Sequence, residues 1–138
     1  MIRGMRRIWL VTASLVGLAC MVVVATAEET EVEPSPVVRA VICPQVSERE
    51  PVAAADSFNV DVGSLYCFTE IQGSEGTVVT HAWIHEGKTR ARVELLVRSA
   101  RWRTWSSKDI HPDWTGSWQV KILDADGIVL KTLDFVLE

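Results

Sequence analysis

The stretch RWRTWSSK, residues 101–108, places two tryptophans, three basic groups and three hydroxyl groups within eight positions. Aromatic rings stack on the faces of sugar rings, and arginine and lysine side chains bind carboxylate and phosphate groups. The combination predicts a surface that binds an anionic ligand, with an acidic glycan as the sensible class. The expected ligand-binding residues are Arg101, Arg103, Trp105, Lys108 and Trp114.

Strand parity decides which of these side chains face the same way. Alternate residues of a strand point to opposite faces, so Trp102 and Trp105, three positions apart, are predicted to lie on opposite sides. Trp105 shares its parity with Arg101 and Arg103, and we expect it to point outward. Trp118 opens an alternating apolar run and is predicted to be core.

Two other functions remain open for the same residues. Tryptophan and arginine are the usual anchors of protein–protein interfaces, so the partner could be a protein of the cell envelope. Alternatively, Arg103 covers Trp105, every tryptophan is structural, and the domain is a scaffold.

Catalytic and metal chemistry is not expected. His81 and His85 lie four residues apart on a predicted strand, about 13 Å by strand rise, which is too far to share one metal ion. A metal site would need His111 together with carboxylates from elsewhere. Ser106 and Ser107 stand beside Lys108, but serine–lysine pairs usually sit on a helical turn, and this segment reads as a strand. We therefore expect no enzyme, no metal and no cofactor.

The N-terminus has the features of an export signal. Residues 1–27 combine Arg3, Arg6 and Arg7 with an uncharged run of 20 residues that ends in Ala-Thr-Ala. This pattern predicts a signal peptide, or an uncleaved membrane anchor, and hence a periplasmic or secreted protein. The acidic, proline-containing residues 28–36 are predicted to form a linker, and residues 37–138 one folded domain.

Charge is unevenly distributed. Removing the three N-terminal arginines from 14 basic groups leaves 11 against 18 acidic ones, a net charge of −7. Between Lys88 and Lys108, however, there are seven bases and one acid, Glu94. This basic stripe either attracts anions or meets the protein's own acids, and the second outcome is the usual one. The negative net charge and the export signal argue against a nucleic-acid partner.

The domain shows no sustained helical period. Alternating segments separated by Gly, Asp and Ser predict an all-β fold, a single antiparallel sandwich of the immunoglobulin-like kind with about seven strands. The expected strands are residues 37–43, 65–72, 77–84, 89–97, 101–107, 116–123 and 128–137. Residues 48–61 form a long connection with a short edge strand near 58–60. Residues 73–76 and 124–127 are predicted hairpin turns, with Gly127 at positive φ.

The hairpin around Glu86 and Gly87 has two possible registers. A two-residue turn would pair Trp83 with Arg90 and expose it. A three-residue turn would pair Trp83 with Thr89 and His81 with Ala91, and would turn the face that holds Val79, Val93 and Leu95 into core. We favour the second register, with Tyr66 and Phe68 joining that core and His81 semi-buried and hydrogen-bonded.

Two cysteines remain in the domain, Cys43 and Cys67. In an exported protein such a pair predicts a disulfide, which would close a loop of about 25 residues. Unpaired core thiols are the alternative.

The chain resembles a bacterial family of domains of unknown function, found in exported and membrane-anchored proteins. The matching pieces are RAV (39–41), REPV (49–52), FTE (68–70), TH-x-W (80–83), WR-x-WSSK (102–108), P-x-WTG-x-W-x-V (112–120) and D-x-x-G-x-x-L (124–130). The resemblance implies a β-sandwich module without an established activity. Its motif residues here are Phe68, Thr69, Glu70, Thr80, His81, Trp83, Trp102, Ser106, Ser107 and Trp118.

Overall fold

The computed structural model of the protein describes residues 34–138. Within them, strands of up to nine residues and one short 3-10 helix follow one another along the chain. In order they are β1 (Val37–Cys43), β2 (Gln45–Ser47), β3 (Glu50–Val52), β4 (Ser57–Phe58), η1 (Val60–Val62), β5 (Ser64–Gln72), β6 (Val78–His85), β7 (Lys88–Leu96), β8 (Arg101–Asp109), β9 (Gly116–Leu123) and β10 (Val129–Leu137).

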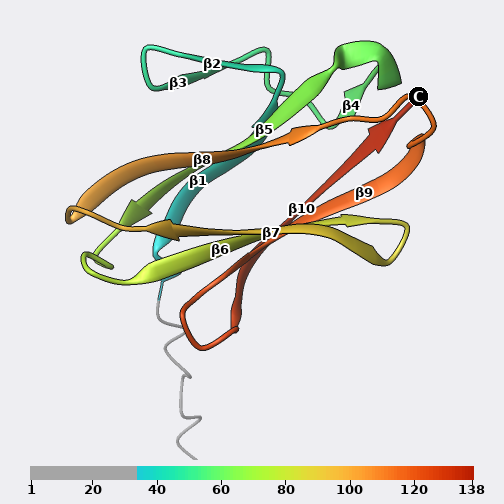
Figure 1. Cartoon of the computed structure of the whole chain (residues 1–138). Coiled ribbons are helices and arrows are strands. Elements are labelled where there is room, and N and C mark those ends of the chain that lie inside the picture. Colours follow the sequence, from blue (N-terminus) through green and yellow to red (C-terminus); the bar gives the residue numbers. More distant parts are fainter. Residues whose placement is uncertain (1–33) are drawn as a thin grey trace, which may run out of the picture. The chain divides into compact units, whose positions relative to one another are not determined.

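Two sheets pack face to face (Figure 1). The first has three strands in the order β1-β5-β8, and the second has five in the order β4-β10-β9-β6-β7. All neighbours in these sheets are antiparallel except the two-residue β4, which runs parallel to β10. The predicted antiparallel β-sandwich is therefore confirmed.

The seven predicted strands are present, and their ends lie within two residues of the predicted ones. The sequence reading missed β2 and β3, which form a separate hairpin inside the predicted 48–61 connection and just before it. The expected edge strand near residues 58–60 is divided between β4 and η1. Such short pieces lack enough residues to show a period.

One of the two predicted hairpin turns was wrong. Residues 73–76 carry the chain from β5 in the first sheet to β6 in the second, and these two strands do not pair. The glycines at this turn do have positive φ, but turn chemistry alone does not decide which strand the chain pairs with next. The 124–127 turn joins β9 to β10, with Gly127 at φ 80°, as predicted.

The β6–β7 hairpin combines features of both predicted registers. Its turn has two residues, Glu86 and Gly87, both at positive φ, which suits a type I′ turn. A bulge then shifts the register, so that Trp83 pairs with Ala91 rather than with Thr89 or Arg90. The favoured turn length was wrong, but the predicted core face was right, because the bulge returns Trp83 to the inside, where it is 0% exposed.

Aromatic side chains fill the space between the sheets. Trp118 stacks on Phe135 with ring centroids 5.8 Å apart, and Trp83 meets the same ring edge-on at 6.3 Å. Tyr66 and Phe68 do not join this core, contrary to expectation. They pair with outward-facing residues of β1, and Phe68 is buried on the outer side of the first sheet instead.

The expected disulfide is absent: Cys43 and Cys67 are both free and buried. Cys67 pairs with Ile42, while Cys43 pairs with Tyr66, so the two thiols belong to opposite faces of the first sheet. Side chains that point apart in this way cannot form a disulfide without a change of register. Burial raises the pKa of the Cys43 thiol, and more strongly that of Cys67.

The predicted signal peptide, residues 1–27, and residues 28–33 of the predicted linker lie outside the described residues. Among residues 34–138, no helix is long and apolar enough to cross a membrane.

Candidate functional site

Strand β8 carries most of the predicted site, and its two faces differ. All nine of its residues pair with β5, which puts Trp105 opposite Phe68, Arg103 opposite Glu70 and Trp102 opposite Ile71. Trp105 lies on the outer face and Trp102 packs against the core, so the predicted opposition of the two tryptophans is confirmed.

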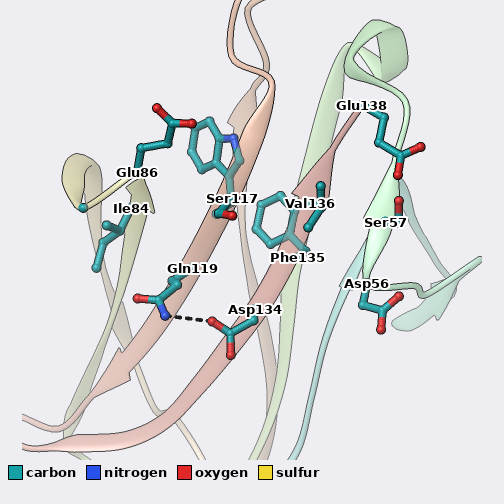
Figure 2. A pocket seen from close by; sticks show the side chains of 12 residues that line it. Asp56, Ser57, Ile84, Glu86, Ser117, Gln119, Asp134, Phe135, Val136 and Glu138 are labelled. Carbon is teal, nitrogen blue, oxygen red and sulfur yellow. Dashed lines mark hydrogen bonds between the residues drawn. The ribbon is translucent and has the colours of Figure 1, made fainter.

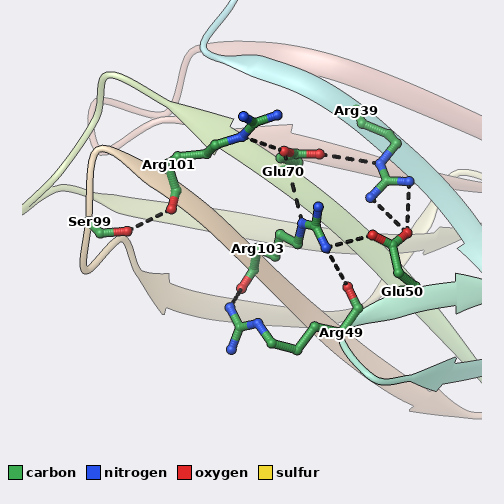
Figure 3. A network of polar contacts seen from close by, with 7 residues as sticks. All are labelled: Arg39, Arg49, Glu50, Glu70, Ser99, Arg101 and Arg103. Atoms are coloured by element: carbon green, nitrogen blue, oxygen red, sulfur yellow. Dashed lines mark hydrogen bonds and ion pairs between the residues drawn. The ribbon is translucent and has the colours of Figure 1, made fainter.

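The outer face of the first sheet carries an arginine network (Figure 3). The carboxylate of Glu70, with only 7% of its side chain exposed, lies 2.9 Å from Arg101, 3.4 Å from Arg39 and 3.9 Å from Arg103. Glu50 contacts Arg39 at 3.1 Å and Arg103 at 2.5 Å. The hydrogen bond from Arg101 lowers the pKa of Glu70, and the one from Arg39 lowers the pKa of Glu50. The basic stripe thus meets the protein's own acids at Arg101 and Arg103.

Trp105 is outward-facing but half-buried. Its ring stacks on Phe68 at 6.0 Å, and the guanidinium of Arg49 lies 5.9 Å from its centroid and 5.4 Å from that of Trp102. Arg49 also donates a hydrogen bond to the carbonyl of Arg103. An arginine therefore covers Trp105, as in the structural alternative, but the residue above the ring is Arg49 rather than Arg103.

The other two predicted ligand residues, Lys108 and Trp114, lie together in a second place, which we call the tryptophan cluster. The Lys108 ammonium is 5.1 Å from the Trp114 centroid, and the Arg90 guanidinium is 5.2 Å from it. His111 and His85 tilt against the same ring at 5.8 and 6.5 Å. The predicted five-residue site is therefore divided into an arginine network and a tryptophan cluster.

The tryptophan cluster differs from the arginine network in its charge balance. Among residues 34–138, no carboxylate lies within 4 Å of the Lys108 or Arg90 charge. Two buried polar atoms, His85 Nδ1 and Arg90 Nε, have no hydrogen-bond partner in the described part of the chain. His85 Nε2 donates a hydrogen bond to the Thr115 carbonyl at 2.8 Å, because a carbonyl oxygen only accepts.

The inner face of β8 holds a chain of buried hydrogen bonds, which we call the polar chain. Thr69 donates to the carbonyl of Thr104 at 2.9 Å, so its oxygen accepts from His81 Nε2 at 3.3 Å. His81 Nδ1 then accepts from Ser106 at 2.7 Å, and Ser106 accepts from Trp83 Nε1 at 3.1 Å. This direction gives every polar hydrogen an acceptor only when the imidazole is neutral.

Burial favours that neutral state, because it lowers the pKa of His81 to about 4. His81 is 0% exposed, more deeply buried than the predicted semi-buried position, and hydrogen-bonded as expected. Ser106 and Thr69 are buried as well, so the polar chain links β5, β6 and β8 across the sandwich.

The remaining motif residues occupy ordinary places. Trp118 is core, as predicted, and it stacks on His85 at 4.6 Å. Thr80 is buried on β6, and Ser107 is exposed on the outer face of β8. Sequence reasoning missed the parts played by Arg39, Glu50 and Arg90, because each depends on a contact with a distant strand.

A groove of about 720 Å³ lies on the second sheet, where the C-terminal residues Val136 and Glu138 help to line it (Figure 2). Its charged lining residues are Asp56, Glu86, Asp134 and Glu138, and none of the described residues that line it is basic. Asp134 accepts a hydrogen bond from Gln119 at 2.7 Å. The acidic lining makes the groove unsuited to an anion. Elsewhere too, the described residues contain no group of three or more His, Cys, Asp and Glu side chains placed to hold a metal.

The fold and these clusters define a small β-sandwich domain with paired cation–aromatic contacts. Residues 76–137 match the model of a family described as "Protein of unknown function (DUF2914)". This match supports the expected resemblance to a family of domains of unknown function. It contains the tryptophan cluster but not Arg39, Glu50 or Glu70. No curated protein matches the chain.

Proposed function

We propose that the domain is a non-catalytic binding module of the cell envelope, and that it holds an anionic glycan at the tryptophan cluster. The observation that carries the proposal is the pair of cations on Trp114, because neither Arg90 nor Lys108 has a carboxylate within 4 Å among residues 34–138. The arginines of the outer network, in contrast, already pair with Glu50 and Glu70.

The chemistry of the cluster suits an acidic sugar. A carboxylate or phosphate group is attracted to Arg90 and Lys108, and the half-buried Trp114 ring beside the exposed His111 offers a surface for a sugar ring. His85 Nδ1 and Arg90 Nε are buried without a hydrogen-bond partner among residues 34–138, and both residues lie against the Trp114 ring. The envelope location rests on the export signal expected at residues 1–27.

The test is calorimetric titration of the purified protein with polygalacturonate, using neutral dextran as the uncharged control. We expect saturable binding to polygalacturonate alone, weaker at high salt, since screening acts on exposed charges. Lys108→Ala should lower the affinity by about ten- to a hundredfold, as a charge-assisted hydrogen bond contributes about 1.5–3 kcal/mol. Lys131→Ala removes the same charge from an exposed position on β10 and should change little.

The proposal fails if polygalacturonate does not bind, or if Lys108→Ala and Lys131→Ala behave alike. Salt-insensitive capture of an envelope protein, unaffected by Lys108→Ala, would favour the protein–protein function.

A further inference from the structure

The β2–β3 hairpin, residues 45–52, is attached to the sandwich as a separate unit, which we call the strap (Figure 1). Its two strands pair with each other and with no strand of either large sheet. Its turn residues, Glu48 and Arg49, have φ of 51° and 61°, which fits a tight two-residue turn. The strap is therefore held to the first sheet largely by side chains, since isolated two-stranded hairpins are only marginally stable.

One strap residue, Glu50, makes most of these polar contacts (Figure 3). Arg39 directs both terminal nitrogens to one carboxylate oxygen, each at 3.1 Å, and Arg103 binds the other oxygen at 2.5 Å. A carboxylate between two guanidinium groups is the arrangement by which proteins bind acidic ligands. Side-chain exposures of 36% for Arg39, 46% for Glu50 and 34% for Arg103 leave all three within reach of solvent.

The charge count around Glu50 favours an external anion. Three guanidinium groups, those of Arg39, Arg101 and Arg103, lie within 4 Å of two carboxylates, those of Glu50 and Glu70 (Figure 3). Glu70 belongs to β5 and is nearly buried, so it stays in place as a counter-ion. Glu50 comes from the strap, as does Arg49, so release of the strap would leave the three guanidinium groups of Arg39, Arg101 and Arg103 against Glu70 alone.

Aromatic rings flank the same position. The guanidinium of Arg39 lies 4.9 Å from the centroid of Phe68, which stacks on Trp105. Arg49 of the strap covers Trp105 at 5.9 Å. Movement of the strap would therefore uncover a carboxylate-binding pair and an aromatic surface at once.

From these contacts we infer a second anion site, distinct from the tryptophan cluster, in which Glu50 stands in for the carboxylate of a ligand. An acidic ligand binds Arg39 and Arg103 by displacing Glu50 and releasing the strap. The apparent affinity of such a site is reduced by the fraction of time that Glu50 occupies it. The strap thus keeps the site closed to weak or dilute anions.

The experiment compares trigalacturonate binding to the intact protein and to Glu50→Gln. We expect the variant to bind about tenfold more tightly, because a neutral amide competes less well for two guanidinium groups. Glu48→Gln, the matched control, removes an equal charge from an exposed position of the same turn and should leave the affinity unchanged. Maltotriose, which lacks carboxylates, should bind neither variant more tightly.

Two further variants separate this site from the tryptophan cluster. The gain in Glu50→Gln should disappear when Arg39→Gln is added and persist when Lys108→Ala is added. Equal affinity in Glu50→Gln and Glu48→Gln, or a gain that survives Arg39→Gln, would overturn the inference. Loss of the gain with Lys108→Ala would also overturn it and would assign all binding to the tryptophan cluster.

Hydrogen exchange of the intact protein provides a readout that does not depend on the variants folding. Saturating trigalacturonate should increase exchange of the backbone amides of residues 45–52 and leave those of β9 unchanged. Unaltered or increased protection of the strap with ligand bound would contradict displacement of Glu50.

Discussion

The two faces of β8 show two ways of accommodating polar residues. On the outer face, Arg101 and Arg103 keep their charges and meet carboxylates while remaining in contact with water. On the inner face, Ser106 and its partner His81 are buried and neutral. A charge is costly to bury, whereas neutral groups become acceptable once each hydrogen bond is made. Alternation along one strand therefore produces a solvated ionic layer and a dry polar layer one residue apart.

The difference predicts that the two faces contribute unequally to stability. The residues of the polar chain are buried from solvent, so water cannot replace a lost hydrogen-bond partner. Disruption of the polar chain should therefore lower the free energy of unfolding strongly. The outer ion pairs are exposed to solvent and salt, so each should contribute little. Three measurements test this contrast.

Acidification should produce the largest effect, through His81. Its pKa falls from an ordinary 6.5 to about 4 on folding, so only the unfolded chain takes up the proton between these values. Stability is unaffected above pH 6.5 and is lost as pH falls toward 4, by about 3 kcal/mol in total. Denaturant unfolding at pH 7, 6 and 5 measures the slope, which should flatten in His81→Gln and persist in His111→Gln. An unchanged slope in His81→Gln would remove His81 from the explanation.

The carboxylates act in a lower pH range. Glu50 and Glu70 have pKa values below the ordinary 4.5, so their contribution is present above that value and is lost as pH falls below it. Measurements above pH 5 therefore report the effect of His81 separately from that of Glu50 and Glu70.

Ser106→Ala should give the next largest effect, about 1–3 kcal/mol of destabilisation. The substitution leaves the Trp83 indole N–H and His81 Nδ1 buried without a partner. Ser107→Ala makes the same chemical change one residue away on the exposed face and should cost no more than about 0.5 kcal/mol. Similar unfolding free energies for the two variants would show that the Ser106 hydroxyl contributes no more to stability than the Ser107 hydroxyl.

Arg101→Ala should have the smallest effect, at most about 1 kcal/mol. The Arg101 side chain is 70% exposed, and Glu70 retains Arg39 and Arg103 after its loss. The exposed Arg98, which has no ion pair among residues 34–138, provides the matched control as Arg98→Ala. Any difference between these variants in thermal unfolding should vanish in about 1 M salt. A larger cost for Arg101→Ala than for Ser106→Ala would reverse the comparison.

The sequence by itself determined the strands of the sandwich and the opposite orientations of Trp102 and Trp105 on one of them, although it misplaced Tyr66 and Phe68. Period-two alternation is a local property, so it placed Trp105 outside and opposite in orientation to Trp102 without knowledge of any partner, whereas the inward position of Trp83 required a choice between two registers. It also indicated Arg101, Arg103, Trp105, Lys108 and Trp114, but not Arg39 or Arg90.

Only the tertiary structure decided which groups meet. Arg103 contacts Glu50 across 53 positions of the chain, and Arg90 on β7 contacts Trp114 in the connection between β8 and β9. The bulge after the β6–β7 turn and the crossing from β5 to β6 likewise depend on how the sheets pack. Ion pairing and register are long-range properties, because their free energies depend on neighbours that alternation within one strand does not specify.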